Sequence, residues 1–369
     1  MDRAPRCGNS RRAGSVRSTS RSCLTNLMIV SVDPVLAYAQ KSQARIIEFI
    51  REMVLCESPS GDAAAIGRFN DLFASRVGGL AKIRRVKGGA WGDHLLCEFA
   101  LPGGRKKTPG MILGLGHSDT VYPMGALKTM PWRETAERLH GPGVLDMKAG
   151  LAFFVFAMEA LRELDIPVVR KVVLQVNSEE EVGSPVSRAL TEKNARASRA
   201  VLVLEPGTGL AGKLKTARKG AGRFEIRARG RAAHAGIDPE AGLSAILEIS
   251  HQVQRLFALD DPGRGISVNV GTIDGGLRPN VVAPEAVAVV DVRAPSSADA
   301  ARVEQAIRAL TPVQHGVPLE VTGGFGRPAM ERTPESAVLW ETARDLGTAI
   351  DLQLEDVSVG GASDGNTTS

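Results

Sequence analysis

The sequence has few cysteines and no long apolar run. Its four cysteines are Cys7, Cys23, Cys56 and Cys97, and none of them forms a C-x-x-C pair. Neither a disulfide framework nor a thiolate zinc site is therefore indicated, and a reducing cytoplasm fits best. The longest apolar candidate, residues 151–157, falls far short of the ~20 apolar residues that a membrane-spanning helix needs. We therefore expect no membrane partner.

A basic surface for nucleic acid is also lacking. The formal net charge is +5, from 46 basic and 41 acidic residues, but residues 1–21 alone hold six arginines and one acidic residue. The remaining chain is balanced, so the excess charge lies in a Ser/Arg-rich tail and not on a folded face. We expect no nucleic-acid partner, and we expect residues 1–27 to be a disordered tail because they have few apolar residues to bury. An over-extended gene start, with the natural start at Met28, is favoured over a transit peptide.

The length and the alternation of elements indicate two domains. With 369 residues the chain exceeds the roughly 250–300 residues at which a single core stops growing. The first half alternates strands and helices, which is typical of a largely parallel α/β sheet. We expect helices at residues 43–53, 148–164 and 186–194, and strands at residues 81–86, 95–100, 111–116, 171–177 and 200–204.

The pattern changes after residue 216. Strands at residues 224–229, 266–271, 286–292 and 319–322, with helices at 239–258 and 297–310, give the order β-α-β-β-α-β of a ferredoxin-like unit. We interpret residues 216–323 as a second domain inserted into a catalytic domain made of residues 28–215 and 324–369. A helix at residues 334–346 and a strand at 357–360 are expected to resume the α/β domain.

Four places in the α/β part carry residues suited to binding a divalent metal. They are His117 with Asp119, then Asp146, then the Glu179–Glu181 run, and finally Glu205. Each has an ordinary explanation when taken alone: a surface pair, a helix cap, a solvated charge run and a strand-end carboxylate. Together they follow strand ends or the loops beyond, and open α/β sheets bind ligands at that edge. His117 could bind a metal while Asp119 holds its other ring nitrogen.

Six segments carry a resemblance to a known family. They read GHSDTVYPMG, GPGVLDMKAG, NSEEEVGS, LEPG, GRAAHAG and GGLRPNVV. In this order they resemble the zinc peptidase family of glutamate carboxypeptidase (carboxypeptidase G), acetylornithine deacetylase, succinyl-diaminopimelate desuccinylase and aminoacylase. The resemblance covers residues 43–366, and the stretch DTVYP favours the glutamate carboxypeptidase branch.

The resemblance implies a centre with two zinc ions, for which cobalt or manganese could substitute. It implies that Asp146 bridges the two ions, that His117 and Glu205 complete one, and that Glu181 binds the other. Glu180 is then the general base, and Glu179 has no direct role. The implied reaction is hydrolysis of the amide bond of a peptide or N-acyl amino acid with a free carboxylate.

The inserted domain is implied to contribute substrate contacts and a homodimer interface. His234 resembles a histidine that reaches into the partner subunit's site and stabilises the oxyanion. Asn280 and Arg293 resemble groups that hold the substrate, and an arginine can clamp a carboxylate with two parallel hydrogen bonds.

One part of the family pattern is missing. Family members continue for about fifty residues beyond the GGASDGN segment, into a Gly-rich loop that carries the last histidine ligand, whereas this sequence stops at Ser369. The second zinc would keep only Asp146 and Glu181. Three alternatives stay open: an active hydrolase, a truncated product with little activity, and a non-catalytic homologue that keeps the fold and dimerisation. Within the active alternative, an N-acyl amino acid deacetylase is a further possibility.

Overall fold

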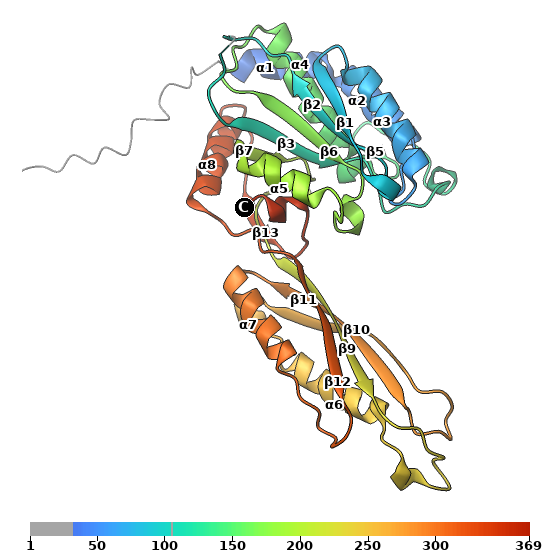
Figure 1. The fold of residues 1–369 in the computed structure, drawn as a ribbon. Coiled ribbons are helices and arrows are strands. Elements are labelled where there is room, and N and C mark those ends of the chain that lie inside the picture. Colours follow the sequence, from blue (N-terminus) through green and yellow to red (C-terminus); the bar gives the residue numbers. More distant parts are fainter. Residues whose placement is uncertain (1–31, 105) are drawn as a thin grey trace, which may run out of the picture. The chain divides into compact units, whose positions relative to one another are not determined.

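The computed structural model describes residues 32–104 and 106–369 (Figure 1), so the expectations for the N-terminal tail and for Met28 lie outside the described residues. The main sheet has the strand order β1-β2-β6-β3-β7. Its strands are β1 (Ala81–Val86), β2 (His94–Phe99), β3 (Met111–His117), β6 (Val172–Asn177) and β7 (Ser198–Val203). Only β2 runs against the others, which confirms the prediction of a mostly parallel sheet.

Strand β3, which lies between β6 and β7, is buried by helix α4 (Ala149–Glu163), and two glycines allow the helix to come close. A β-carbon on Gly114 would lie 2.7 Å from the ring of Phe154, and one on Gly116 would lie 2.8 Å from Leu151. Any larger side chain at these positions would push α4 away from the sheet. The glycines therefore fix the depth at which the end of β3 sits.

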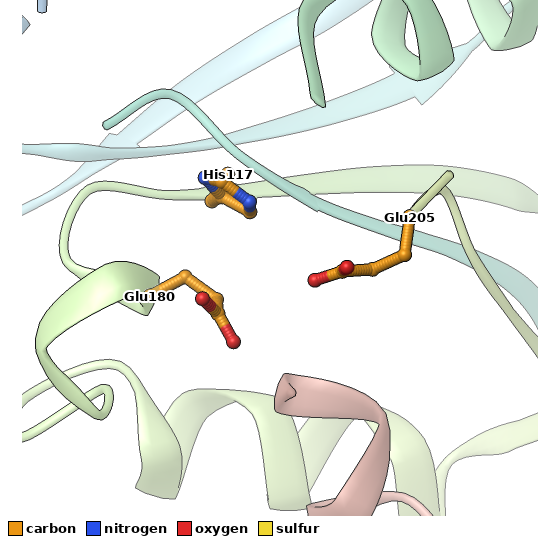
Figure 2. A group of neighbouring side chains, drawn as sticks. All are labelled: His117, Glu180 and Glu205. Atoms are coloured by element: carbon orange, nitrogen blue, oxygen red, sulfur yellow. The ribbon is translucent and has the colours of Figure 1, made fainter. Parts of the chain in front are cut away.

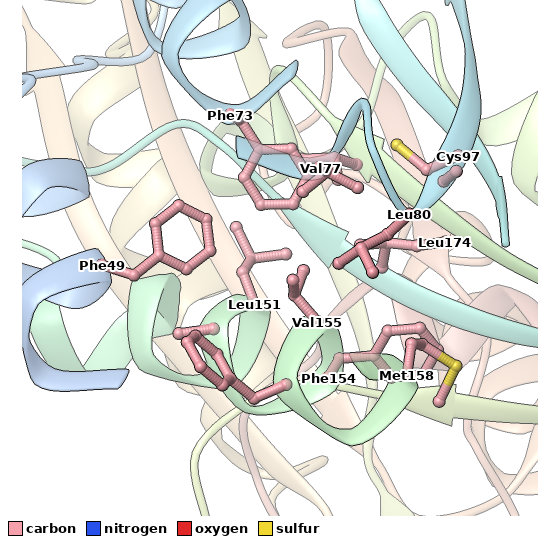
Figure 3. Packing of buried hydrophobic residues seen from close by; sticks show 14 of the residues in the cluster. Phe49, Phe73, Val77, Leu80, Cys97, Leu151, Phe154, Val155, Met158 and Leu174 are labelled. Atoms are coloured by element: carbon pink, nitrogen blue, oxygen red, sulfur yellow. The ribbon is translucent and has the colours of Figure 1, made fainter. Parts of the chain in front are cut away.

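Helices α1 (Val32–Lys41), α2 (Gln43–Leu55) and α3 (Ala63–Val77) complete this layer. Figure 3 shows Phe49 of α2 and Phe73 of α3 converging on Leu151 of α4, over Leu174 of β6. Helix α3 begins where the side chain of Asp62 accepts a hydrogen bond from the backbone nitrogen of Ala65, at 2.9 Å. The sequence analysis predicted α2 but not α1 or α3.

A second, four-stranded antiparallel sheet has its own core. Its order is β10-β11-β9-β12, with β9 (Gly220–Arg229), β10 (Ser267–Gly275), β11 (Glu285–Ala294) and β12 (Leu319–Arg327). Alternate residues of β11 are buried, as expected for a sheet covered on one face. Helices α6 (Ala245–Phe257) and α7 (Ser297–Arg308) contact these strands, which gives the predicted β-α-β-β-α-β order. The exact domain boundaries stay a prediction.

The C-terminal elements differ from the expectation. Strand β13 (Asp356–Val359) does not join the five-stranded sheet but pairs in parallel with β8 (Leu214–Arg218), a strand that the sequence analysis did not predict. Strand β8 carries two cationic residues in five, Lys215 and Arg218, so its composition does not indicate an extended conformation. Helix α5 (Arg188–Arg196) follows β6, and α8 (Pro334–Thr348) precedes β13. None of the described helices is long and apolar enough to cross a membrane.

Candidate metal centre

His117 ends strand β3, and the two neighbouring strands bring carboxylates to the same level. In the register of the sheet His117 lies opposite Asn177 of β6, two residues before the start of the glutamate run. On the other side Leu115 lies opposite Val203 of β7, so Glu205, two residues further on, is level with His117. Parallel strands all present their C-terminal ends at one edge, which is why these side chains meet.

The ring of His117 is held from both sides. Its Nδ1 lies 2.9 Å from the backbone oxygen of Asp119 and 3.4 Å from the Asp119 carboxylate, and its Nε2 lies 3.1 Å from Oδ1 of Asp146. Burial by itself lowers the pKa of His117, but the two carboxylates outweigh it and the pKa ends well above its usual range. The hydrogen bond between the His117 ring and the Asp146 carboxylate lowers the pKa of Asp146. The sequence prediction that Asp119 faces the second ring nitrogen agrees with this geometry.

Asp119 also holds the glutamate loop. Its carboxylate accepts hydrogen bonds from the backbone nitrogens of Glu180 at 3.1 Å and Glu181 at 3.2 Å, and from Oγ of Ser60 at 2.7 Å. It is 1% exposed. One buried carboxylate therefore orients the histidine and the loop that carries two further carboxylates.

Two groups of potential metal ligands share His117. One consists of His117, Glu180 and Glu205 (Figure 2), and the other of His117, Asp146 and Glu181; within each group the ligand atoms lie within 4.8 Å of one another. The residues given metal or base roles in the sequence analysis are thus brought together. The geometry differs from the prediction in two respects. His117, and not Asp146, is common to both groups, and Glu180, which was predicted to be the base, joins Glu205 as a possible ligand.

The carboxylate of Glu180 has two fixed partners that the sequence analysis missed. Arg327, at the end of β12, donates to its Oε1 at 2.6 Å and to its backbone oxygen at 2.8 Å. The backbone nitrogen of Asp364 donates to the same Oε1 at 3.1 Å. Asp364 belongs to the quoted GGASDGN segment, whereas Arg327 stands in no motif and carries no signal in a single sequence.

The other two glutamates have different surroundings. A guanidinium nitrogen of Arg218 lies 3.5 Å from Oε2 of Glu205. Burial, with the nearby carboxylates of Asp146 and Glu180, raises the pKa of Glu181 to about 7 against the opposing effect of His117. A carboxyl group that resists ionisation in this way gains most from an added positive charge.

Glu179 closes the loop on which Glu180 and Glu181 stand. Its Oε1 accepts from the backbone nitrogens of Val186 at 3.1 Å and Ser187 at 2.6 Å. Its Oε2 accepts from the hydroxyl of Ser178 at 3.1 Å, and that hydroxyl also lies 3.0 Å from Nδ1 of the buried His94. Glu179 is fully buried and points away from the ligand groups, consistent with its having no direct role.

The structure does not bring the three residues predicted to bind substrate together within one chain. The backbone oxygen of Asn280 accepts a hydrogen bond from the backbone nitrogen of Ala235, so Asn280 and the exposed His234 lie in neighbouring loops near the start of β11. Arg293 is near the other end of β11, eight residues after Glu285, or about 26 Å at ~3.3 Å per residue. Its guanidinium is bonded to Asp291 at 2.8 and 2.9 Å.

The chemistry of the donors fits a zinc-like ion. Zinc binds imidazole nitrogen and carboxylate oxygen. Each group here offers one imidazole and two carboxylates. The Asp119 contact supplies the outer hydrogen bond that metal-binding histidines usually have. The fold and this centre define a class of protein in which an α/β unit with a candidate divalent-metal centre at the edge of its parallel strands is combined with a second, antiparallel α/β unit.

The comparisons with known proteins agree with that class. Residues 216–316 match the M20 peptidase dimerisation domain. The chain is 29% identical to carboxypeptidase G2 of a Pseudomonas strain over 258 residues, which cover 69% of this chain and 61% of that protein. It is 30% identical to acetylornithine deacetylase of Myxococcus xanthus, over 57% of each chain. The family resemblance noted in the sequence is confirmed, and the chain spans about three fifths of the length of the curated relatives it matches.

Solved structures share the fold. Aminopeptidase PepT from Bacillus cereus matches with a TM-score of 0.71 at 22% identity, covering 88% of this chain and 87% of its own. An M20 family metallo-carboxypeptidase from Sulfolobus solfataricus matches with a TM-score of 0.60 at 14% identity, covering 88% and 86%. At these identities the likeness concerns the arrangement of elements.

Proposed function

We propose that the chain is a zinc-dependent amidohydrolase of the glutamate carboxypeptidase type, which cleaves the amide bond of a peptide or N-acyl amino acid with a free carboxylate. The observation that carries the proposal is the placement of His117 in two overlapping groups of ligands at the C-terminal edge of the sheet. The names of the relatives, carboxypeptidase G2 and acetylornithine deacetylase, support an amide substrate.

In this proposal His117, Asp146, Glu181 and Glu205 would hold two metal ions. The sharing of Asp146 between the ions rests on the family resemblance. Bound zinc would supply a water of lowered pKa and a positive charge beside the scissile carbonyl, and cobalt or manganese could serve in its place. Asp119 keeps the Nδ1–H of His117 directed away from the metal, so that Nε2 is free to coordinate.

Glu180 is proposed as the general base. Its Oε1 is occupied by Arg327 and by the backbone of Asp364, which leaves Oε2 to accept the proton of a water molecule. The same oxygen would later return the proton to the leaving amine. The Glu180 carboxylate can act either as the general base or as a metal ligand, and the variant Glu180→Gln distinguishes these two roles.

A homodimer is proposed to complete the site. His234 and Asn280 lie too far from Arg293, along the length of β11, for one chain to gather all three around one substrate. The match of residues 216–316 to a dimerisation domain supports a partner copy whose His234 enters the site. We also propose a cytoplasmic location, for which the free thiols of Cys56 and Cys97 are the support.

Metal analysis of the dialysed protein tests the centre. We expect at least one zinc per chain, and we expect Asp146→Ala to lower the zinc content, since it removes a ligand from the His117, Asp146 and Glu181 group. Asp274→Ala, on the exposed end of β10, is the matched control. An unchanged zinc content in Asp146→Ala would show that this residue is not the shared ligand.

Kinetics test the reaction. Hydrolysis of N-benzoyl-glutamate should be faster than hydrolysis of its α-amide, because loss of a charge-assisted contact costs a few kcal/mol in the transition state. Glu180→Gln should abolish turnover while zinc content stays, if Glu180 is the base. Loss of zinc in that variant would make Glu180 a ligand, and equal rates on both substrates would exclude a carboxylate clamp.

A further inference from the structure

A pocket adjoins the candidate metal centre between β7, β8 and α8. Its cavity volume is about 260 Å³, enough for a small organic ligand. Glu205, a candidate ligand of the metal, is part of its wall. The pocket is therefore adjacent to the candidate metal centre, and apart from Glu205, Pro206 and Gly207 of the LEPG segment no other residue of its wall belongs to the family motifs quoted above.

The end of the pocket next to the metal ligands is cationic. Lys215 and Arg218 of β8 both line it, and both act on the nearby carboxyl group of Asp146. Arg218 is 5% exposed and is already engaged, 3.5 Å from Glu205 and 3.1 Å from the backbone oxygen of Gly361. Within residues 32–104 and 106–369, the Lys215 ammonium has neither a hydrogen bond nor an ion pair. An anion entering the pocket would be its natural partner.

The other end of the pocket is apolar. Trp340 and Leu339 of α8 and Leu202 of β7 line it, together with Met330. Leu202 is 43% exposed and Leu339 is 39% exposed, although both are large apolar side chains. Helix α8 has only one buried residue, Gly347, so its apolar side chains have little cover from the described chain. An apolar ligand group would remove this surface from water.

We propose that this pocket binds the free carboxylate and the adjoining apolar group of the substrate. The carboxylate meets Lys215 and Arg218, and an aliphatic or aromatic group lies against Trp340 and Leu339. This inference refines the proposed function and rests on it, because the bound ligand is a substrate only if the chain is a hydrolase. It moves recognition of the carboxylate from Arg293, whose guanidinium is bonded to Asp291 by two nitrogens, to the unpaired ammonium of Lys215.

Calorimetric titration with 4-phenylbutanoate tests the pocket, since this ligand has the carboxylate and the apolar group but no amide to cleave. We expect binding in the millimolar range, as is usual for a ligand of this size. Lys215→Gln should weaken binding about tenfold or more, and Lys215→Arg should restore most of it. The neutral 4-phenylbutan-1-ol should bind more weakly and should not respond to Lys215→Gln. Lys171→Gln, which removes an exposed lysine paired with Glu98, is the matched control.

Titrations are made on the zinc-loaded protein and again with EDTA, because a carboxylate could also bind the metal directly. The Lys215 effect should persist in both states. Trp340→Ala should weaken both ligands and Trp340→Phe should retain them, with circular dichroism confirming that α8 is intact. Equal affinity of wild type and Lys215→Gln in both states overturns the pocket and leaves the hydrolase proposal standing. Lys215-dependent binding without hydrolysis of any N-acyl amino acid overturns the hydrolase proposal alone.

Discussion

The substitution Asp119→Asn separates the orienting role of this carboxylate from a purely structural one. The side chain keeps its size but loses its charge and one of its two acceptor oxygens. In the native protein those oxygens serve Ser60 and the backbone nitrogens of Glu180 and Glu181, and one of them faces His117 at 3.4 Å. The variant therefore acts on the histidine and on the glutamate loop together.

Two magnitudes follow from this geometry. Removing the outer partner of a metal-binding histidine typically costs tenfold to a hundredfold in metal affinity, or about 1.4–2.7 kcal/mol. The variant keeps the backbone oxygen of Asp119, which lies 2.9 Å from Nδ1 of His117, so we expect the lower end of this range from loss of the carboxylate charge at 3.4 Å. Leaving one buried backbone N–H of the loop without an acceptor costs about 1–3 kcal/mol of folding free energy. Asp119 is 1% exposed, so water cannot replace the lost acceptor.

A competition titration against a chromogenic chelator measures the first quantity, and urea unfolding with EDTA measures the second. Asp93→Asn is the control, since the Asp93 carboxylate pairs with the exposed ammonium of Lys87 at 3.0 Å and should change neither quantity by more than about 0.5 kcal/mol. Lower stability with unchanged zinc affinity in Asp119→Asn would refute the orienting role and leave Asp119 as a structural acceptor.

Three further predictions concern the fold and the charge of the site. Leu174→Ala, at a fully buried position of β6, should lower the free energy of unfolding by about 2–5 kcal/mol, as measured by urea unfolding. Glu248→Gln should cost about 1–3 kcal/mol in the same assay, because this buried carboxylate accepts hydrogen bonds from the backbone nitrogens of Val313 and Gln314. Glu304→Gln should cost less than about 0.5 kcal/mol, because the half-buried Glu304 only pairs with Arg308 on the same helix, α7. In the metal-free protein, Glu181→Gln should make the free energy of unfolding fall less steeply with rising pH between about pH 4.5 and 7. Folded Glu181, with its pKa raised to about 7, keeps a proton that the unfolded chain releases above its ordinary value of 4.5, so this group makes stability fall as the pH rises. Equal slopes in the two proteins at pH 5 and pH 7 would contradict the raised pKa.

The position of the site could be predicted from the sequence because it depends on strand ends. The run of β3 before His117 and that of β7 before Glu205 are short apolar segments bounded by turns, and parallel order makes their ends meet. The ferredoxin-like order was predictable for a similar reason, since its strands and helices show clear periods of 2 and 3.6. Local pattern sufficed wherever one element carries its own signal.

Contacts between distant segments could not be predicted in this way. Arg327 meets Glu180 across 147 positions of sequence, and neither the arginine nor its neighbours show a pattern that points to a carboxylate. Strand β8 is extended only because β13 pairs with it from more than a hundred residues away. The contact between Arg218 of β8 and Glu205 could not be predicted for the same reason. Such pairings depend on tertiary packing, which overrides local propensity.

The charges around His117 indicate where an added cation matters most. In the group of His117, Glu180 and Glu205, each carboxylate already has an arginine: Arg327 at 2.6 Å from Glu180 and Arg218 at 3.5 Å from Glu205. In the group of His117, Asp146 and Glu181, the described part of the chain offers no ion pair to Glu181, and His117 is the nearest partner of Asp146. Burial raises the pKa of Glu181, and the nearby carboxylates of Asp146 and Glu180 add to this effect. A metal bound there gains two carboxylates without displacing an arginine, whereas one bound by Glu180 and Glu205 must compete with both. The group of His117, Asp146 and Glu181 is thus the one whose electrostatics favour the first metal ion most strongly.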